Sequence, residues 1–195
     1  MKTAPRPLVA LAALLLLVPA TAGCMNLATY LAHAIRGHRV PAEYEGLEGK
    51  RVAVVCVSGS FDGPRSPSTL LAIEMERILR KEVDDIKLIS QDKVSAWKDT
   101  NDWRENDYRE IGQGVDAELV MAVELRRFSL YDGPTLYQGK AEVDLVVYDV
   151  KTGEPAFERG TPEHRFPANG YHDPNMREAH FQQIYLKTLA HHLCK

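Results

Sequence analysis

The stretch VAVVCV, residues 52–57, is apolar at every position and decides the fold class. A short run without polar alternation is typical of a strand that is buried on both faces of a sheet. Ser66 and Pro67 follow, and they predict a helix N-terminus, because serine caps a first turn and proline suits its first position. A buried strand followed by a crossover helix favours a parallel pair of strands.

The remaining elements follow from apolar periodicity and from turn residues. Helices are expected from Pro67 to near Val83, from Ser90 or Asp92 through Trp97, over 102–111, and from Asp173-Pro174 onwards; strands are expected over 86–90, 118–131, 140–150 and 155–160. Residues 160–173 are expected to form a polar loop. The predicted fold class is α/β (α+β), a mixed sheet with the order β-α-β-α-β-β-β-α and with helices packed on it.

The N-terminus has the layout of an export signal. Lys2 and Arg6 precede an apolar run over residues 8–18, and small residues follow it. This run of about 11 residues is short against the roughly 20 that a membrane-spanning helix needs. We expect a signal peptide over 1–23, a tether over 24–49 with a candidate short amphipathic helix, and one α/β domain over 50–195.

The residues before Cys24 decide how the signal is processed. The sequence Thr21-Ala22-Gly23-Cys24 resembles the lipobox of bacterial lipoproteins, although Thr21 stands where leucine is usual. The resemblance implies that Cys24 becomes the first mature residue and carries acyl chains such as palmitate, which would anchor the protein to a membrane. Two alternatives stay open: plain secretion after an A-x-A site that ends at Ala22, and an uncleaved anchor.

Localisation and partners follow from the same region and from the charge. The lipobox resemblance implies the cell envelope with the domain in the periplasm, and Met25 in place of aspartate favours the outer membrane. Removing Lys2 and Arg6 lowers the formal net charge from −3 to about −5. Because the chain has no basic stripe, we expect no binding of nucleic acid. The sequence does not indicate the oligomeric state.

Cys56 and Cys194 are the other two cysteines, and two interpretations stay open for them. Cys56 can be a small buried core residue. Alternatively, the two side chains can form a disulfide, since the envelope is oxidising.

The loop after the first strand, SGSFDGPRS over 58–66, is the candidate partner or ligand loop. It lies between a strand and a helix, where phosphate loops lie, but it lacks the Gly-Lys-Ser/Thr ending of such a loop. An ordinary connecting loop is the simpler interpretation, although loops often carry function. The candidate residues are Ser58, Ser60, Phe61, Asp62 and Arg65.

Other chemistry has little support in the residues. The seven histidines show no H-E-x-x-H spacing, and we expect neither a metal nor a cofactor. No G-x-S-x-G motif is present. Glu142 and Asp144 share a strand face, where a cross-strand match with Arg126 explains them better than catalysis. The aromatic residues 97, 103 and 108 are expected to pack in the core, with a glycan-stacking or partner-stacking surface as the alternative.

Three segments together resemble a group of envelope proteins. They are VAVVCVSGS, GVDAELVMAVELRRF with Gly114-Val115-Asp116, and AEVDLVVYDVKTGEPAFE with residues 149–153. The group comprises the TolB amino-terminal domain, the penicillin-binding-protein activator lipoproteins and the curli-secretion lipoprotein. The resemblance implies a non-enzymatic lipoprotein that docks on another envelope protein. The alternative is an envelope lipoprotein that binds a small ligand or a glycan, and a hydrolase has the least support.

Overall fold

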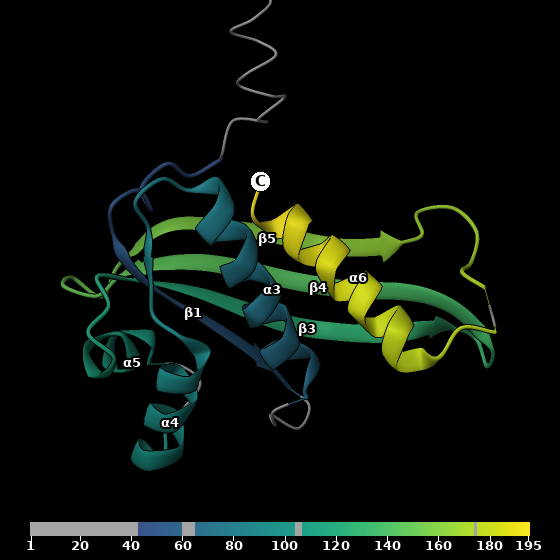
Figure 1. Ribbon diagram of the computed structural model, residues 1–195, viewed down its shortest axis with the longest axis horizontal. Helices are drawn as coiled ribbons and strands as arrows, with labels where there is room; N and C mark the ends of the chain where they lie inside the picture. The colour runs from purple at the N-terminus through teal and green to yellow at the C-terminus, as the bar shows by residue number, and fades with distance from the viewer. Residues whose placement is uncertain (1–42, 60–64, 104–106, 174) are drawn as a thin grey trace, which may run out of the picture. The chain divides into compact units, whose positions relative to one another are not determined.

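A five-stranded mixed sheet forms the centre of the described part of the chain (Figure 1). The computed structural model describes residues 43–59, 65–103, 107–173 and 175–195. The strand order is β2-β1-β3-β4-β5. β1 (Arg51–Ser58) lies parallel to β2 (Lys87–Leu88) and to β3 (Leu119–Asp132), whereas β4 (Leu136–Asp149) lies antiparallel to β3 and to β5 (Pro155–Phe166). The predicted mixed α/β fold is confirmed.

Four helices pack on this sheet in the described residues. α3 (Pro67–Glu82) and α6 (Glu178–Leu193) lie side by side on one face (Figure 1). α4 (Gln91–Asn101) and α5 (Tyr108–Gly114) cover the other face where β1 and the first half of β3 lie. α6 returns the chain to the beginning of the domain, where the backbone N–H of Glu43 donates to the carbonyl oxygen of Lys195 at 3.2 Å.

β1 contributes to two separate cores, and this explains its unbroken apolar sequence. Val52, Val54 and Cys56 face the larger core under α3 and α6. Ala53 and Val55 face the smaller core under α4 and α5. Because successive side chains of a strand point to opposite faces, a strand with a core on each side must be apolar throughout.

The second face of the sheet is only partly covered. Along β4, buried residues such as Val143 and Leu145 alternate with half-exposed residues such as Glu142 and Asp144. The buried positions face α3 and α6, and the polar ones face outward beyond the reach of α4 and α5. That half of the sheet is an exposed polar surface.

Several sequence-based boundaries are wrong. The expected loop over 160–173 begins later, because β5 continues to Phe166 and its partner β4 begins at Leu136. The last helix begins at Glu178 rather than after Asp173, whose carboxylate accepts from the backbone N–H of Asn175 at 2.8 Å and so closes a local turn. The segment between β2 and β3 holds two helices, as expected, although the second begins at Tyr108 and ends at Gly114 rather than spanning 102–111.

The predictions for the N-terminus concern residues that the structure does not describe. The signal peptide, Cys24 and the tether as far as residue 42 lie outside the described residues. Within the described part, no helix has the length and apolar content needed to cross a membrane.

Candidate docking surface at the hairpin end of the sheet

The candidate loop after β1 is described only at its two ends. Ser60, Phe61 and Asp62 lie outside the described residues. Ser58 is buried at the end of β1, and Arg65 is exposed just before α3. The loop therefore stays a candidate without a described geometry.

Both described cysteines are thiols in the structure. Cys56 is buried in the larger core, as the core interpretation expects. Cys194 follows α6 and lines a small cavity of about 50 Å³ together with Tyr44, Met121 and Phe157. Burial raises the pKa of the Cys194 thiol to about 12, so that the group is held in its neutral, unreactive form.

Exposed apolar side chains gather at the hairpin that joins β3 to β4. Leu136 is 37% exposed and Tyr171 is 51% exposed, and these are two of the three most exposed large apolar residues of the described chain. Tyr131 of the same hairpin points to the opposite face of the sheet, where its ring stacks on Tyr137 at 5.1 Å between centroids and its hydroxyl donates to Glu178 of α6 at 2.5 Å. We refer to Leu136 and Tyr171, with the polar pair Asp132 and Lys140, as the tyrosine tip.

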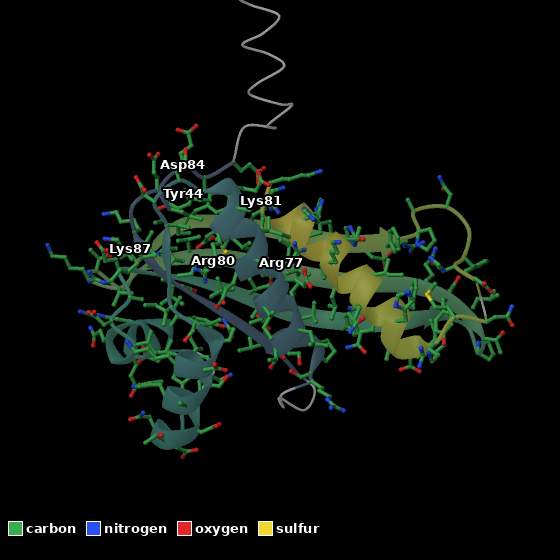
Figure 2. The ribbon with its side chains drawn as sticks, in the orientation of Figure 1. Tyr44, Arg77, Arg80, Lys81, Asp84 and Lys87 are labelled. Carbon is green, nitrogen blue, oxygen red and sulfur yellow. The ribbon has the colours of Figure 1, made fainter. Side chains whose placement is uncertain are left out.

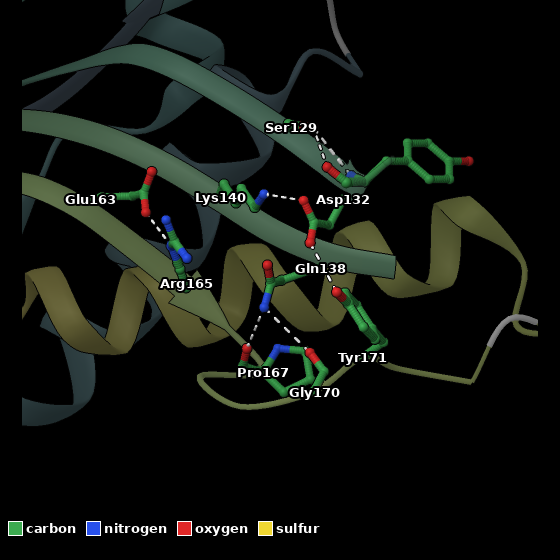
Figure 3. Close-up of polar contacts among 10 residues, drawn as sticks. Ser129, Asp132, Gln138, Lys140, Glu163, Arg165, Pro167, Gly170 and Tyr171 are labelled. Atoms are coloured by element: carbon green, nitrogen blue, oxygen red, sulfur yellow. Dashed lines mark hydrogen bonds and ion pairs between the residues drawn. The ribbon is translucent and has the colours of Figure 1, made fainter. Parts of the chain in front are cut away.

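A polar network fixes the tyrosine tip (Figure 3). The Nζ of Lys140 lies 2.6 Å from Oδ1 of Asp132, and the hydroxyl of Tyr171 donates to Oδ2 of Asp132 at 3.1 Å. Lys140 and then Tyr171 hold the pKa of Asp132 below its ordinary value. The same hydrogen bond to Asp132 raises the pKa of Tyr171. Asp132 is therefore held as a carboxylate and Tyr171 as a protonated hydroxyl, which are the forms that keep the network together.

The loop that carries Tyr171 is held to the sheet from below. The side-chain amide of Gln138, which is buried, donates to the carbonyl oxygens of Pro167 and Gly170 at 3.3 Å each (Figure 3). The backbone N–H of His172 donates to the carbonyl oxygen of Tyr137 at 2.9 Å. Tyr171 is thus presented by a fixed backbone on both sides.

This arrangement suits protein recognition better than catalysis. Tyrosine offers a large amphipathic surface with few rotatable bonds, and it is enriched at the centres of protein interfaces. The sequence alone did not reveal the site, because Asp132, Lys140 and Tyr171 meet only through strand pairing and loop return. The one local signal is YDGPTLY, residues 131–137, in which two tyrosines bracket a turn.

The exposed half of the sheet carries ion pairs rather than an active site. Arg126 lies 2.5 Å from Asp144, which confirms the expected cross-strand match. Arg127 lies 3.1 Å from Glu142. Both carboxylates therefore have a cationic partner, and the simplest role of this face is solubility.

The aromatic residues near α5 pack together, as expected. Trp103 contacts Tyr108 edge to face at 5.7 Å, and Tyr108 stacks on Tyr148 at 5.2 Å between centroids. Trp97 is partly buried against the smaller core. Three or more His, Cys, Asp or Glu side chains able to share a metal ion do not come together anywhere in the described residues.

The outer face of α3 is a second exposed surface. Ile73 is 45% exposed and is followed along the helix by Arg77, Arg80 and Lys81 (Figure 2). Arg77 forms a pair with Glu74 at 2.7 Å on the same helix. An isolated apolar residue among charges is normal for a solvated helix, and Ile73 therefore serves below as a control position.

The comparisons with known proteins find solved structures of similar fold but assign this chain to no family. No family model matches the chain, and no curated protein does. Among solved structures, lipoprotein GNA1162 from Neisseria meningitidis is similar with a TM-score of 0.49 and 9% identity, covering 74% of this chain and 99% of that chain. A PelC dodecamer from Paraburkholderia phytofirmans has a TM-score of 0.46 and 11% identity, covering 80% and 96%. The LpoB C-terminal domain from Salmonella enterica has a TM-score of 0.38 and 15% identity, covering 67% and 89%.

Proposed function

We propose that this chain is a lipid-anchored accessory lipoprotein of the bacterial envelope, and that it docks on another envelope protein through the tyrosine tip. The lipobox-like sequence that ends at Cys24 supports the anchor. Within the described residues, the exposed side chains of Tyr171 and Leu136 support docking. The polar network of Asp132, Lys140 and Tyr171 fixes this part of the surface.

The observation that carries this proposal is the distance between the first residues of the domain and the tip. Glu43 lies beside Lys195, at the end of the domain where β1 and β3 begin. The tip lies where the 14-residue β3 ends, and such a strand spans roughly 45 Å at about 3.3 Å per residue. The tip therefore lies at the other end of β3 from Glu43, the first described residue of the domain.

The anchor would also raise the local concentration of the tip near envelope partners. The segment between Cys24 and Glu43 has fewer than twenty residues, which reach at most roughly 65 Å when fully extended. Confinement to such a layer strengthens weak docking without any new contact.

A site-specific crosslinking experiment tests docking. A photocrosslinking residue at position 171 or 136 should capture one dominant envelope protein in intact cells, and the same residue at position 73 should not. Tyr171→Ala together with Leu136→Ser should remove the captured complex, whereas Ile73→Ser should leave it. Equal capture from the tip and from position 73 would reject the tip as the docking surface.

A fractionation experiment tests the anchor separately. Cys24→Ala should release the protein from membranes and abolish acylation. Continued membrane retention of this variant would reject the lipid anchor while leaving the docking proposal to be judged on its own.

One observation favours a second candidate function, the binding of a small ligand. A hollow of about 470 Å³ opens where β1 and β3 begin, with Tyr44, Lys50, Asp149 and Lys151 among its lining residues. Its volume is within the range of about 300–1,000 Å³ that ligand pockets occupy. Binding of envelope glycans to the purified chain, lost in Tyr44→Ala and kept in Tyr171→Ala, would support this function over docking.

A further inference from the structure

A cluster along the edge strand β5 joins three parts of the domain. Arg159 of β5 places Nη1 2.6 Å from a carboxylate oxygen of Glu43, and its Nη2 donates to the carbonyl oxygen of His192 at 2.9 Å. The ring of His192 lies 5.0 Å from the ring of His164 between centroids. We refer to Glu43, Arg159, His164 and His192 as the Arg159 clasp.

The Arg159 clasp fixes the first residues of the domain. Glu43 is bound both by Arg159 and, through its backbone N–H, by the carbonyl oxygen of Lys195. The next residue, Tyr44, stacks on Phe157 of β5 at 5.3 Å between centroids. The chain therefore enters the domain through an ion pair, a backbone hydrogen bond and an aromatic stack.

The Arg159 clasp is incompletely satisfied. In the described part of the chain, two buried side-chain nitrogens have no hydrogen-bond partner, and both belong to it: Nε of Arg159 and Nδ1 of His164. Buried polar atoms without a partner are rare in folded proteins, because each costs a desolvation penalty. Because both nitrogens belong to the Arg159 clasp, we infer that this cluster is less stable than the core around it.

Charge makes this joint sensitive to acid. Around the two histidines lie Arg159 and Glu163 from β5, Tyr185 and Lys195 from α6 and the residues after it, and Glu43 from the first residues of the domain. Glu43 already neutralises Arg159. Protonation of His164 and His192 would thus add two positive charges next to Arg159 and Lys195, and like charges at short range repel.

The pKa values have the direction that this charge distribution requires. Burial, followed by His192, lowers the pKa of His164, and burial, followed by Arg159 and Lys195, lowers the pKa of His192. A histidine whose folded pKa is lowered binds fewer protons in the closed state than in the open one. The stability of the closed state is then full above the ordinary histidine pKa of about 6.5 and falls as the pH drops below it.

We propose that the Arg159 clasp is an acid-sensitive joint, closed at neutral pH and opened in weak acid, that controls whether the first residues of the domain are held against β5 and α6. This inference concerns the folded domain and is independent of the partner and of the lipid. Opening would release residues 43 and 44 from their contacts with β5 and with the residues after α6.

Cys194 provides the measurement, because it lines the cavity beside Glu43 and Arg159. The full chain in detergent is treated with dithiodipyridine, a thiol reagent that works in weak acid, at about pH 7.5 and at about pH 5. Labelling of the Cys194 peptide is measured by mass spectrometry and divided by the rate in the unfolded chain at the same pH. Because protonation of the two histidines favours the open form, we expect labelling to rise several-fold in acid.

Matched variants separate the joint from general effects of acid. His164→Gln with His192→Gln should remove the acid response, whereas His191→Gln, at an exposed position on the same helix, should keep it. His192→Gln alone also affects an exposed side chain, so it should fold and remove part of the response. Glu43→Gln should open the clasp at both pH values.

Three results would overturn the proposal. The first is equal Cys194 labelling of the unmodified chain at the two pH values. The second is an acid response that survives in the double histidine variant. The third is parallel labelling of Cys56, which lies in the larger core and would then report unfolding of the whole domain.

Discussion

Tyr185 of α6 lies directly against Gly139 of β4, so that a Cβ placed on Gly139 would be 2.4 Å from Cγ of the tyrosine ring. The ring is fully buried, and its hydroxyl donates to the carbonyl oxygen of His164 on β5 at 3.0 Å. One tyrosine thereby fastens α6 to two strands, and this close approach requires a position without a side chain.

The first prediction follows from this contact. Gly139→Ala should lower the free energy of unfolding by about 1–3 kcal/mol, because the added methyl group forces the buried ring or the helix to move. Urea unfolding of the two proteins measures the loss. Gly59→Ala is the control, since a Cβ there meets nothing within 4 Å. Equal losses in the two variants would show that Tyr185 can move aside at no cost.

The second prediction concerns the start of α3. Oγ of Ser66 accepts from the backbone N–H of Thr69 at 3.2 Å, as a helix N-cap does. Ser66→Ala should therefore lower the free energy of unfolding by about 1 kcal/mol. Ser90 occupies the same position before α4 but makes no side-chain cap bond, so Ser90→Ala should cost clearly less in the same unfolding assay. The reverse order would contradict the assignment of Ser66 as the cap.

A capping residue followed by proline predicted the start of α3 correctly but not the start of α6, and the reason is physical. A Ser-Pro or Asp-Pro pair shows that a cap is available, but it does not decide whether the chain turns into a helix at once. Ser66 caps α3 directly, whereas the Asp173 carboxylate is used by Asn175 and the helix begins at Glu178. The cap signal therefore predicted the start of α3 correctly and placed the start of α6 too early.

The extent of β5 and the tyrosine tip depend on contacts that are distant in sequence. Pro162 and Gly160 indicate a loop, yet β5 is an edge strand with a register shift in its pairing with β4, where proline is tolerated. The buried run of β1, in contrast, needs no partner to be recognised. The tip could not be predicted, because Tyr171 reaches Asp132 only through the loop that Gln138 holds.

The third prediction concerns the ionisation of Asp132. Lys140→Met should raise the pKa of Asp132 towards its ordinary value, because the ammonium group contributes most to lowering it. Tyr171→Phe should raise it less, since it removes the second contribution. A carboxyl NMR titration of Asp132 measures both. Lys151→Met, which changes a lysine in the turn after β4, should have no effect.

The lowered pKa of Asp132 also determines how its contribution to stability changes with pH. A carboxyl whose folded pKa is lowered stabilises the folded state above its unfolded value of about 3.9, and this contribution is lost as the pH falls through the folded value. The acid loss of stability that comes from Asp132 should therefore shrink in Lys140→Met. An unchanged Asp132 titration in both variants would mean that the contacts of Figure 3 do not persist in solution.

The last prediction decides the state of the cysteines. Cys56 is only 7% exposed, and the neutral thiol of Cys194 lies beside the small cavity, so both should react slowly in the folded chain at neutral pH. Once the acylated chain is unfolded in denaturant without reductant, both thiols should react with a chromogenic disulfide reagent, and added reductant should reveal no more. Thiols that appear only after reduction would instead establish the Cys56–Cys194 disulfide.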